Sequence, residues 1–393
     1  MEYLITILLI AYGIIQYDMR HIENKKSRNL FNLICCIFIV LSSIAYHIGT
    51  DAYAYLNEFD EYINLSSINT KYLLSFNRYQ PGWVLFQVLS KSIIPSYYFM
   101  KLLYASFINI IICNFIRSNT KYVFTGLLLY GVILYLFFNF EIYRQAMAVA
   151  IFLFSLKFFN ARKWIKYIIS VGCAFLFHSS ALILLVVPFF NFKLYKQHLI
   201  ISIALAVGLF AIKDLALDYV QSFLSIGLIP AVSGSDLIEY YMNSDRYGDS
   251  GFSISNLIYY CFYVIFPLFS IYYLNNKGYE IKYQGLIVFS CLIYLLGQII
   301  PIFFRLNQYF QVINILFYVD IIMVLPQILF KRNWKLVSTT MCVFFVYFFS
   351  GTYFQEIGKM GYKSGVRYYP YYSIITEQTN PAREEIFNNM SSY

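Results

Sequence analysis

A carboxylate, a guanidinium and an amide stand close together at the start of one apolar segment: Glu141, Arg144 and Gln145. If a helix begins at residue 140, the spacings of three and four residues place these side chains on one helical face. Ionisable groups in an apolar helix are costly and are often functional, although a local ion pair between Glu141 and Arg144 would also neutralise both charges. We interpret Glu141 as a candidate catalytic residue, and Arg144 and Gln145 as candidate substrate-binding residues.

Two further side chains could take part in proton transfer. His178 lies between two apolar runs and is followed by two serines; a neutral imidazole can accept a proton or hydrogen-bond a sugar hydroxyl, and a lone histidine can also be structural. Asp51, in the stretch Gly49-Thr50-Asp51, could act as a base, orient a sugar or cap the helix that follows. Both residues are therefore candidate catalytic residues with a structural alternative.

Three arginines elsewhere in the chain could bind an anionic substrate. Arg305 lies where one apolar run ends and the next begins, so its guanidinium could bind phosphate oxygens in a bidentate manner or reach lipid headgroups. Arg78 lies in the first long polar segment. Arg246 lies in a later one, where aromatic residues and charges mix as they do in sugar-binding surfaces and in ordinary interfacial loops.

The elements that must position these side chains are membrane helices. Of the 393 residues, 60% are hydrophobic and 12% are charged, against roughly 25% charged in a soluble domain, so most of the chain must lie in lipid. We predict an all-α, polytopic integral membrane protein that forms a single transmembrane domain over residues 1–393, with about twelve transmembrane helices. The apolar runs are 3–16, 29–48, 97–116, 122–140, 142–158, 164–177, 179–192, 199–222, 254–274, 283–303, 306–328 and 336–352.

The distribution of basic residues predicts the orientation of these helices. With the amino terminus outside, most lysines and arginines fall in short cytoplasmic loops, as the positive-inside rule requires. The opposite, extracytoplasmic side then carries outer loops 49–96 and 223–253 and a C-terminal tail, residues 353–393. The candidate residues lie on this side.

Two short apolar segments need separate interpretation. Segment 81–94 is too short to span a membrane, and we predict a short interfacial or re-entrant helix. Runs 164–177 and 179–192 could form one helix through His178, but merging them would place later basic clusters outside. We therefore predict a hairpin for 164–192.

Several classes of function are disfavoured. The net charge of +9 comes from basic residues scattered over many loops, so we expect no nucleic-acid partner. The seven cysteines show neither Cys-x-x-Cys nor Cys/His spacing, and the sequence has no Gly-rich phosphate loop, His-Glu-x-x-His motif or nucleophile elbow. We expect no metal, no cofactor and no nucleotide-driven chemistry.

Four of these elements together resemble the EpsG family of Wzy-type polysaccharide polymerases: residues 49–53, 141–148, 177–183 and Arg305. Their order and spacing also match, and the resemblance extends from about residue 45 to 310. One departure is Gln80, because the family tends to have an acid before Pro-Gly. A catalytic carboxylate cannot operate at that position in this chain.

The resemblance implies an enzyme of the bacterial cytoplasmic membrane that builds exopolysaccharide, capsule or O-antigen. It would transfer a growing glycan from undecaprenyl diphosphate to another lipid-linked repeat unit on the outer face. Arg144 and Arg305, supported by Arg78, would then bind the diphosphate, and Glu141, Asp51 or His178 would bind the acceptor hydroxyl. The implied partners are undecaprenyl-diphosphate-linked glycans and membrane lipids, with chain-length regulator and flippase proteins as further candidates.

Two other functions remain alternatives. A single-sugar membrane glycosyltransferase with a polyprenyl-phosphate donor also uses an acid early in its first outer loop, where Asp51 lies. A lipid-linked oligosaccharide flippase has a similar number of helices, but it is expected to line a central cavity with charges at mid-membrane depth.

Overall fold

The computed structural model describes residues 2–68, 72, 79–211, 254–298, 300, 302–357 and 361–391. In these residues all regular elements are helical, and the only β-pairing consists of two isolated bridges, as the predicted all-α class requires. The chain divides into two compact units: unit 1 is Met1–Leu185 with Ile322–Tyr393, and unit 2 is Val186–Ile321. A single transmembrane domain over residues 1–393 stays a prediction.

In the described part of the chain, seven helices are long and apolar enough to cross a membrane. Roughly 20 apolar residues at 1.5 Å per residue match the hydrocarbon thickness of ~30 Å. The seven are Glu2–Arg20, Lys25–Ser43, Tyr97–Asn119, Val123–Phe140, Leu257–Asn276, Gln311–Phe330 and Trp334–Phe354. Four shorter apolar helices are Trp164–Phe175, Ser179–Phe190, Lys196–Gly208 and Gln284–Gly297. The chain is an integral membrane protein, and a total of about twelve spans stays a prediction.

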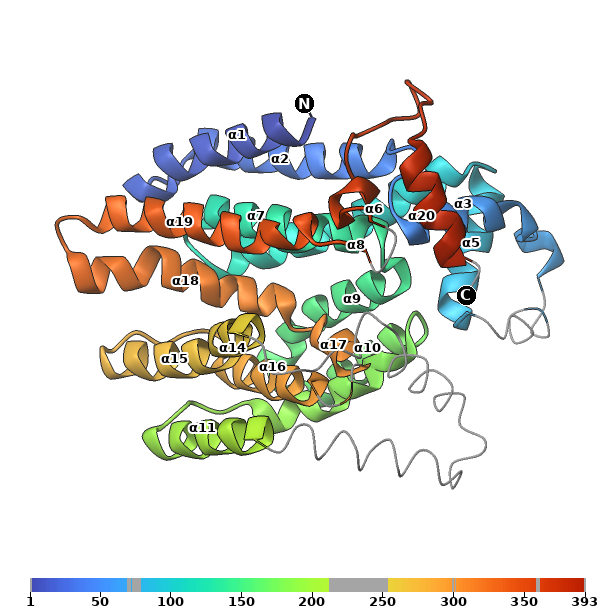
Figure 1. The fold of residues 1–393 in the computed structure, drawn as a ribbon. Coiled ribbons are helices and arrows are strands. Elements are labelled where there is room, and N and C mark those ends of the chain that lie inside the picture. The colour runs from blue at the N-terminus through green and yellow to red at the C-terminus, as the bar shows by residue number, and fades with distance from the viewer. Residues whose placement is uncertain are drawn as a thin grey trace. The chain divides into compact units, whose positions relative to one another are not determined.

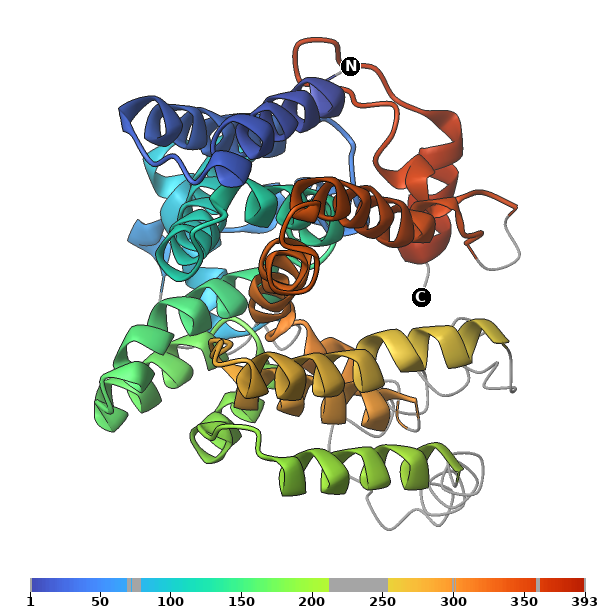
Figure 2. The same ribbon diagram turned by 90° about the vertical axis from the view of Figure 1, so that its left-hand side faces the viewer.

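Unit 1 contains most of the candidate residues. Its helices are α1 (Glu2–Gln16), η1 (Asp18–Arg20), α2 (Lys25–Ser43), α3 (Thr50–Glu58), η2 (Phe59–Glu61), η3 (Leu65–Ser67), α5 (Pro81–Ile93), α6 (Tyr97–Asn119), α7 (Val123–Tyr130), η4 (Gly131–Tyr135), α8 (Leu136–Phe140), α9 (Tyr143–Asn160), α10 (Trp164–Phe175), α19 (Trp334–Ser350), η7 (Gly351–Phe354), η8 (Ser364–Arg367) and α20 (Pro381–Ser391). Two helices continue into unit 2, η5 (Ser179–Phe190) and α18 (Gln311–Phe330). Figures 1 and 2 show α1 and α2 side by side, and α6 packs against α2 and α9.

The composition of α9 explains its central place in unit 1. Ala146, Ala148 and Ala150 are completely buried, and buried residues occur around the whole circumference of the helix. Small side chains let helix backbones approach closely in a membrane, where packing replaces the hydrophobic effect between helices. Helix α9 therefore packs against both α6 and α10, and its first turn is held at a fixed place in unit 1.

The helices of unit 1 run between two ends. At one end the His21 ring lies 5.7 Å from the Tyr122 ring and 5.6 Å from the Trp334 ring, which brings together the α1–α2, α6–α7 and α18–α19 connections. We call this the basic end, because most of its charged residues are lysines and arginines. They are Arg20, Lys25, Lys26, Arg28, Arg117, Lys121, Arg162, Lys163, Lys331, Arg332 and Lys335.

The opposite end of unit 1 holds the candidate residues, and we call it the site end. It consists of residues 44–51, 138–144 and 176–180 and of the described residues of the C-terminal tail, 353–357 and 361–391. The backbone N–H of Gly49 donates to Arg367 O at 3.3 Å, so the start of α3 lies against the tail. Figure 1 shows α20 of the tail beside α3.

The structure shows helices in both short segments that were interpreted separately, and the interfacial or re-entrant position of segment 81–94 stays a prediction. Segment 81–94 forms a separate helix, α5, whose 13 residues cover only ~20 Å. The predicted hairpin 164–192 consists of α10 and η5, which are separated by a break at residues 176–178. Tyr167 Oη donates to Leu184 O at 2.7 Å, and one continuous helix would separate these residues by ~25 Å.

Unit 2 is a smaller helical group. Its other helices are α11 (Lys196–Ala211), α14 (Ile254–Tyr260), η6 (Cys261–Ile265), α15 (Phe266–Asn276), α16 (Gln284–Gly297) and α17 (Ile302–Asn307). Helices α11, α15 and α16 pack against one another. Buried polar side chains pair within this group: Ser290 Oγ donates to Asn307 Oδ1 at 2.6 Å, and Asn314 Nδ2 donates to Ser290 Oγ at 2.8 Å.

Candidate active site

Glu141 lies in the junction between two helices rather than on α9. Helix α8 ends at Phe140 and α9 begins at Tyr143, so the predicted helical face shared by Glu141, Arg144 and Gln145 is wrong. The alternative of a local ion pair between Glu141 and Arg144 is also wrong, because the cation paired with Glu141 is Arg367. The carboxylate of Glu141 and the guanidinium of Arg144 therefore lie in different surroundings.

The two carboxylate oxygens of Glu141 have different environments. Oε2 accepts a hydrogen bond from Thr50 Oγ1 and lies 3.4 Å from Arg367 Nη1. Oε1 is buried and has no hydrogen-bond partner among the described residues, an arrangement that is costly unless it serves a purpose. Burial and the charge of Glu141 raise the pKa of Tyr368 well above its ordinary value, so this neighbour stays a neutral phenol. Thr50 and Arg367 thus hold Oε2 of Glu141, and the phenol of Tyr368 lies beside the same carboxylate.

The stretch Gly49-Thr50-Asp51 connects α3 to this junction. Gly49 has φ +83° and ψ +146°, and its Cα lies directly against the backbone of Phe140, where a Cβ would clash. This conformation is essentially restricted to glycine. Thr50 can therefore reach Glu141, and Asp51 Oδ2 accepts a hydrogen bond of 3.1 Å from the backbone N–H of Tyr143.

Asp51 thus caps a helix, but not the one that follows it in sequence. Helix α9 has no side-chain cap of its own at Ile142, and the carboxylate of Asp51 takes that place from α3. A carboxylate at a helix N-terminus satisfies a free N–H and interacts favourably with the helix dipole. The catalytic role expected for Asp51 stays a prediction.

Arg144 is held by neutral partners. Its Nε donates to Tyr55 Oη at 2.9 Å and its Nη1 donates to Gln80 Oε1 at 3.0 Å, while the guanidinium lies 4.7 Å from the centroid of the Tyr79 ring. Burial and the charge of Asp51 raise the pKa of Tyr55 well above its ordinary value. No carboxylate forms an ion pair with Arg144, and three of its five N–H donors have no partner in the described residues. Arg144 therefore keeps its positive charge and can bind an anion.

The segment Gln80-Pro81-Gly82 joins Arg144 to the turn that carries His178. Gln80 precedes α5 and Pro81 is its first residue, a favourable position for proline. Gly82 N donates to Leu176 O at 2.8 Å, and a Cβ on Gly82 would lie 2.6 Å from that oxygen. The turn between α10 and η5, which carries His178, is therefore held against Gly82 at the start of α5.

The hydrogen bonds of His178 indicate its tautomer. The backbone N–H of Ser180 donates to His178 Nδ1 at 3.3 Å, and Ser180 Oγ lies 2.6 Å from the same nitrogen. Because Nδ1 accepts, the proton of the neutral ring is on Nε2. In this state His178 can donate a hydrogen bond from Nε2, and its acceptor nitrogen is already used.

The roles of the remaining candidate residues stay predictions. Gln145 is buried within α9. Arg305 is exposed on α17 in unit 2, and its grouping with Glu141 and Arg144 stays a prediction. Arg78 and Arg246 lie outside the described residues.

Sequence reasoning missed two cations of the site end. Arg367 lies in the C-terminal tail, and nothing in the sequence links it to Glu141. Lys101 lies inside an apolar run, is 1% exposed and donates to Ala45 O at 2.8 Å, with its Nζ 5.4 Å from the centroid of the Phe140 ring. A lysine buried in a membrane helix was the available signal.

The site end has no metal cluster in its described residues, since no group of three or more His, Cys, Asp or Glu side chains could hold a metal ion there. The family model for the EpsG family matches residues 28–375. This range includes Thr50, Glu141, Arg144, His178 and Arg367. No curated protein and no solved structure matches the chain.

Proposed function

Because the chain belongs to the EpsG family, we propose that it polymerises undecaprenyl-diphosphate-linked oligosaccharide repeat units into a surface polysaccharide. The reaction is glycosyl transfer at the outer face of the cytoplasmic membrane. The main support from the site is the contrast between Glu141, one buried oxygen of which has no hydrogen-bond partner among the described residues, and Arg144, three donors of which have none among the same residues. A base and an anion-binding group are the two parts that this transfer requires.

The chemistry divides between these residues. The acceptor hydroxyl oxygen attacks the anomeric carbon of the donor glycan, and the bond from that carbon to the diphosphate oxygen breaks. Undecaprenyl diphosphate leaves with the bonding electrons, and the hydroxyl proton passes to Glu141 Oε1. Arg144 stabilises the charge that develops on the diphosphate, because charge-assisted hydrogen bonds in a shielded site favour the departing anion.

His178 and Asp51 take supporting roles in this proposal. His178 Nε2–H donates to a sugar or phosphate oxygen. Asp51 holds the first turn of α9 and thereby orients the backbone that carries Arg144. The protein binds, orients and removes one proton, since the diphosphate leaving group already activates the donor.

The charge distribution of unit 1 supports an extracytoplasmic site. Cytoplasmic loops of membrane proteins are enriched in lysine and arginine, and the connections at the basic end have this composition. The basic end therefore belongs in the cytoplasm. The site end then faces outward, where flipped lipid-linked repeats are presented.

A deletion strain tests the proposed function. Its lipid-linked glycans are extracted and measured by mass spectrometry, and their side is determined with a membrane-impermeant glycan oxidase on whole cells. We expect complete single repeats on the outer side and loss of the polymer ladder. Repeats that accumulate inside would indicate a flippase, and truncated repeats would indicate a single-sugar transferase; either result would contradict the proposal.

A further inference from the structure

The C-terminal tail forms part of the wall around Glu141. Its backbone pairs with the segment between α2 and α3: Tyr46 N donates to Tyr372 O and Ile374 N donates to Ile44 O, both at 2.9 Å. Arg367 O accepts from Gly49 N, the residue directly before Thr50. The tail is therefore joined to the same loop that supplies a hydrogen bond to Glu141.

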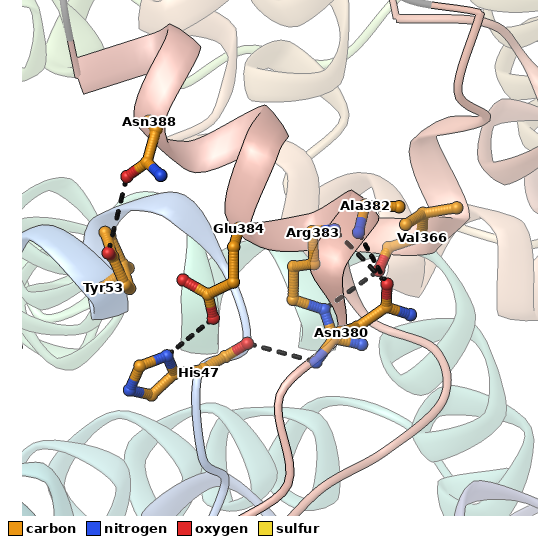
Figure 3. Close-up of polar contacts among 8 residues, drawn as sticks. All are labelled: His47, Tyr53, Val366, Asn380, Ala382, Arg383, Glu384 and Asn388. Atoms are coloured by element: carbon orange, nitrogen blue, oxygen red, sulfur yellow. Dashed lines mark hydrogen bonds and ion pairs between the residues drawn. The ribbon is translucent and has the colours of Figure 1, made fainter.

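A buried arginine fixes the tail in this place (Figure 3). Arg383 is completely buried and donates to three carbonyl oxygens: Val366 O at 3.0 Å, His47 O at 3.1 Å and Pro370 O at 2.6 Å. Its guanidinium also lies 5.6 Å from the centroid of the Tyr372 ring. The bond to His47 O joins the tail to the α2–α3 connection, the bonds to Val366 O and Pro370 O connect parts of the tail, and none of the three involves the side chain of Arg367.

The helix that carries Arg383 is itself well defined. Asn380 caps α20, accepting from Ala382 N at 3.0 Å, and Pro381 occupies the first turn. Glu384 Oε1 lies 2.7 Å from His47 Nδ1. The attachment of the tail thus has several polar contacts that do not involve Glu141.

Arg367 differs from these anchors because its guanidinium faces the candidate base. Its side chain is 10% exposed, and its Nη1 lies 3.4 Å from Glu141 Oε2. Its Nε donates weakly to Ser364 O at 3.4 Å. A cation and the Thr50 hydroxyl on the same oxygen fix the orientation of the carboxylate, and the proposed function assigns the acceptor proton to the other oxygen, Oε1.

Given the polymerase function proposed above, we infer that Arg367 is a positioning residue, which acts on the reaction only through Glu141. The tail supplies this residue, so the catalytic site is completed by residues from the last part of the chain. Arg367 does not touch the substrate in this scheme. Its loss should therefore lower kcat and leave KM nearly unchanged.

The test uses the full chain in proteoliposomes, with lipid-linked single repeats from the deletion strain as substrate. Arg367→Met should lower kcat about 100-fold, because small displacements of a catalytic group have effects of this size. Arg367→Lys, which keeps the charge, should recover most of the loss. Lys363→Met removes an exposed positive charge from the same tail and should keep the wild-type rate, and thermal melting of each variant checks that it is folded.

A double variant separates positioning from a general structural effect. Glu141→Gln and the double variant Glu141→Gln/Arg367→Met should have equal, low rates, because Arg367 has nothing left to position. A further loss in the double variant, or a normal kcat for Arg367→Met beside a slow Glu141→Gln, would overturn the positioning role and leave the proposed function intact. A wild-type rate for Glu141→Gln would instead discard Glu141 as the base.

Discussion

Asp51 on α3 caps the N-terminus of α9 by accepting a hydrogen bond from the backbone N–H of Tyr143. The two residues lie far apart in sequence, and α9 lacks a capping side chain of its own. The bond joins the first polar loop to the helix that carries Arg144. Asp51, which the sequence suggests as a catalytic residue, therefore has a structural role as a helix cap.

Replacing Asp51 separates its two roles. Asp51→Ala should destabilise the protein by about 1 kcal/mol, the usual effect of losing a helix cap, and should lower the polymerisation rate by loosening α9. Asp51→Asn should keep both stability and rate near wild type, because asparagine caps a helix as well as aspartate does. Thermal melting and rates in proteoliposomes measure this; equal inactivity of the Ala and Asn variants would show that Asp51 acts as a base.

Gly49 gives a second prediction, which concerns the backbone. Gly49→Ala should destabilise the protein by roughly 2 kcal/mol or more, because the residue combines a positive φ with close contact to the backbone of Phe140. The matched control is Gly351→Ala, since a Cβ there meets no atom within 4 Å. The thermal midpoint in detergent should fall for Gly49→Ala and stay unchanged for Gly351→Ala, and equal midpoints would contradict this account.

Local sequence patterns predicted much of this fold. Apolar runs bounded by basic loops predicted the membrane helices, and the short segment 81–94 and the hairpin 164–192 appear as α5 and as α10 with η5. Each of these features depends on residues that are close in sequence. The composition and length of an apolar run are then enough to predict such a helix.

The candidate site was predicted less completely, because its contacts are long-range. The residues of Gly49-Thr50-Asp51 were singled out, but the partners of Thr50 and Asp51 lie in the α8–α9 junction. Arg367 reaches Glu141 from the tail, and no spacing rule relates two residues so far apart in the chain. The helix start was misplaced at residue 140 because the cap that begins α9 belongs to α3.

Gln80 illustrates how a neutral residue can matter at such a site. Its amide oxygen accepts from Arg144, where an acid would form an ion pair and neutralise the guanidinium. The neutral oxygen of Gln80 therefore leaves the charge of Arg144 uncompensated at this contact, as the proposed binding of a phosphate requires. The sequence showed the substitution, and only the structure shows which cation it affects.

Arg144 should be more sensitive to substitution than any arginine at the basic end. Arg144→Ala should lower the polymerisation rate at least about 100-fold, as loss of a preorganised charge-stabilising donor does, and lipid-linked single repeats should accumulate. Arg144→Lys should also be impaired, because an ammonium group cannot reproduce the fork that binds Tyr55, Gln80 and a phosphate together.

The control for Arg144 is Arg332→Ala, which removes an exposed charge from the basic end. The variants are expressed in the deletion strain and compared by polymer length on gels. Their lipid-linked glycans are compared by mass spectrometry. Polymer of wild-type length in Arg144→Ala would contradict the proposal that Arg144 binds the diphosphate. A defect in Arg332→Ala of the same size would show that the effect is not specific to the site end.

His178 provides a prediction that distinguishes a hydrogen-bond donor from a base. Its Nδ1 accepts from the Ser180 backbone, so the ring donates through Nε2–H, and the proposed function assigns this donor to a substrate oxygen. His178→Gln can place an amide N–H near that position and should keep much of the activity. His178→Ala cannot, and its kcat/KM should fall roughly 10–100-fold, which corresponds to one hydrogen bond to a charged group.

The comparison between the two His178 variants decides the role. If His178 acts as a base, the Gln and Ala variants should lose activity equally, because neither side chain titrates in the range of imidazole. If His178 acts as a hydrogen-bond donor, only the Ala variant should lose this activity. Rates in proteoliposomes, with melting curves to confirm folding, should therefore rank wild type above His178→Gln and His178→Ala last; equal inactivity of both variants would assign proton transfer to His178 and leave Glu141 with a binding role.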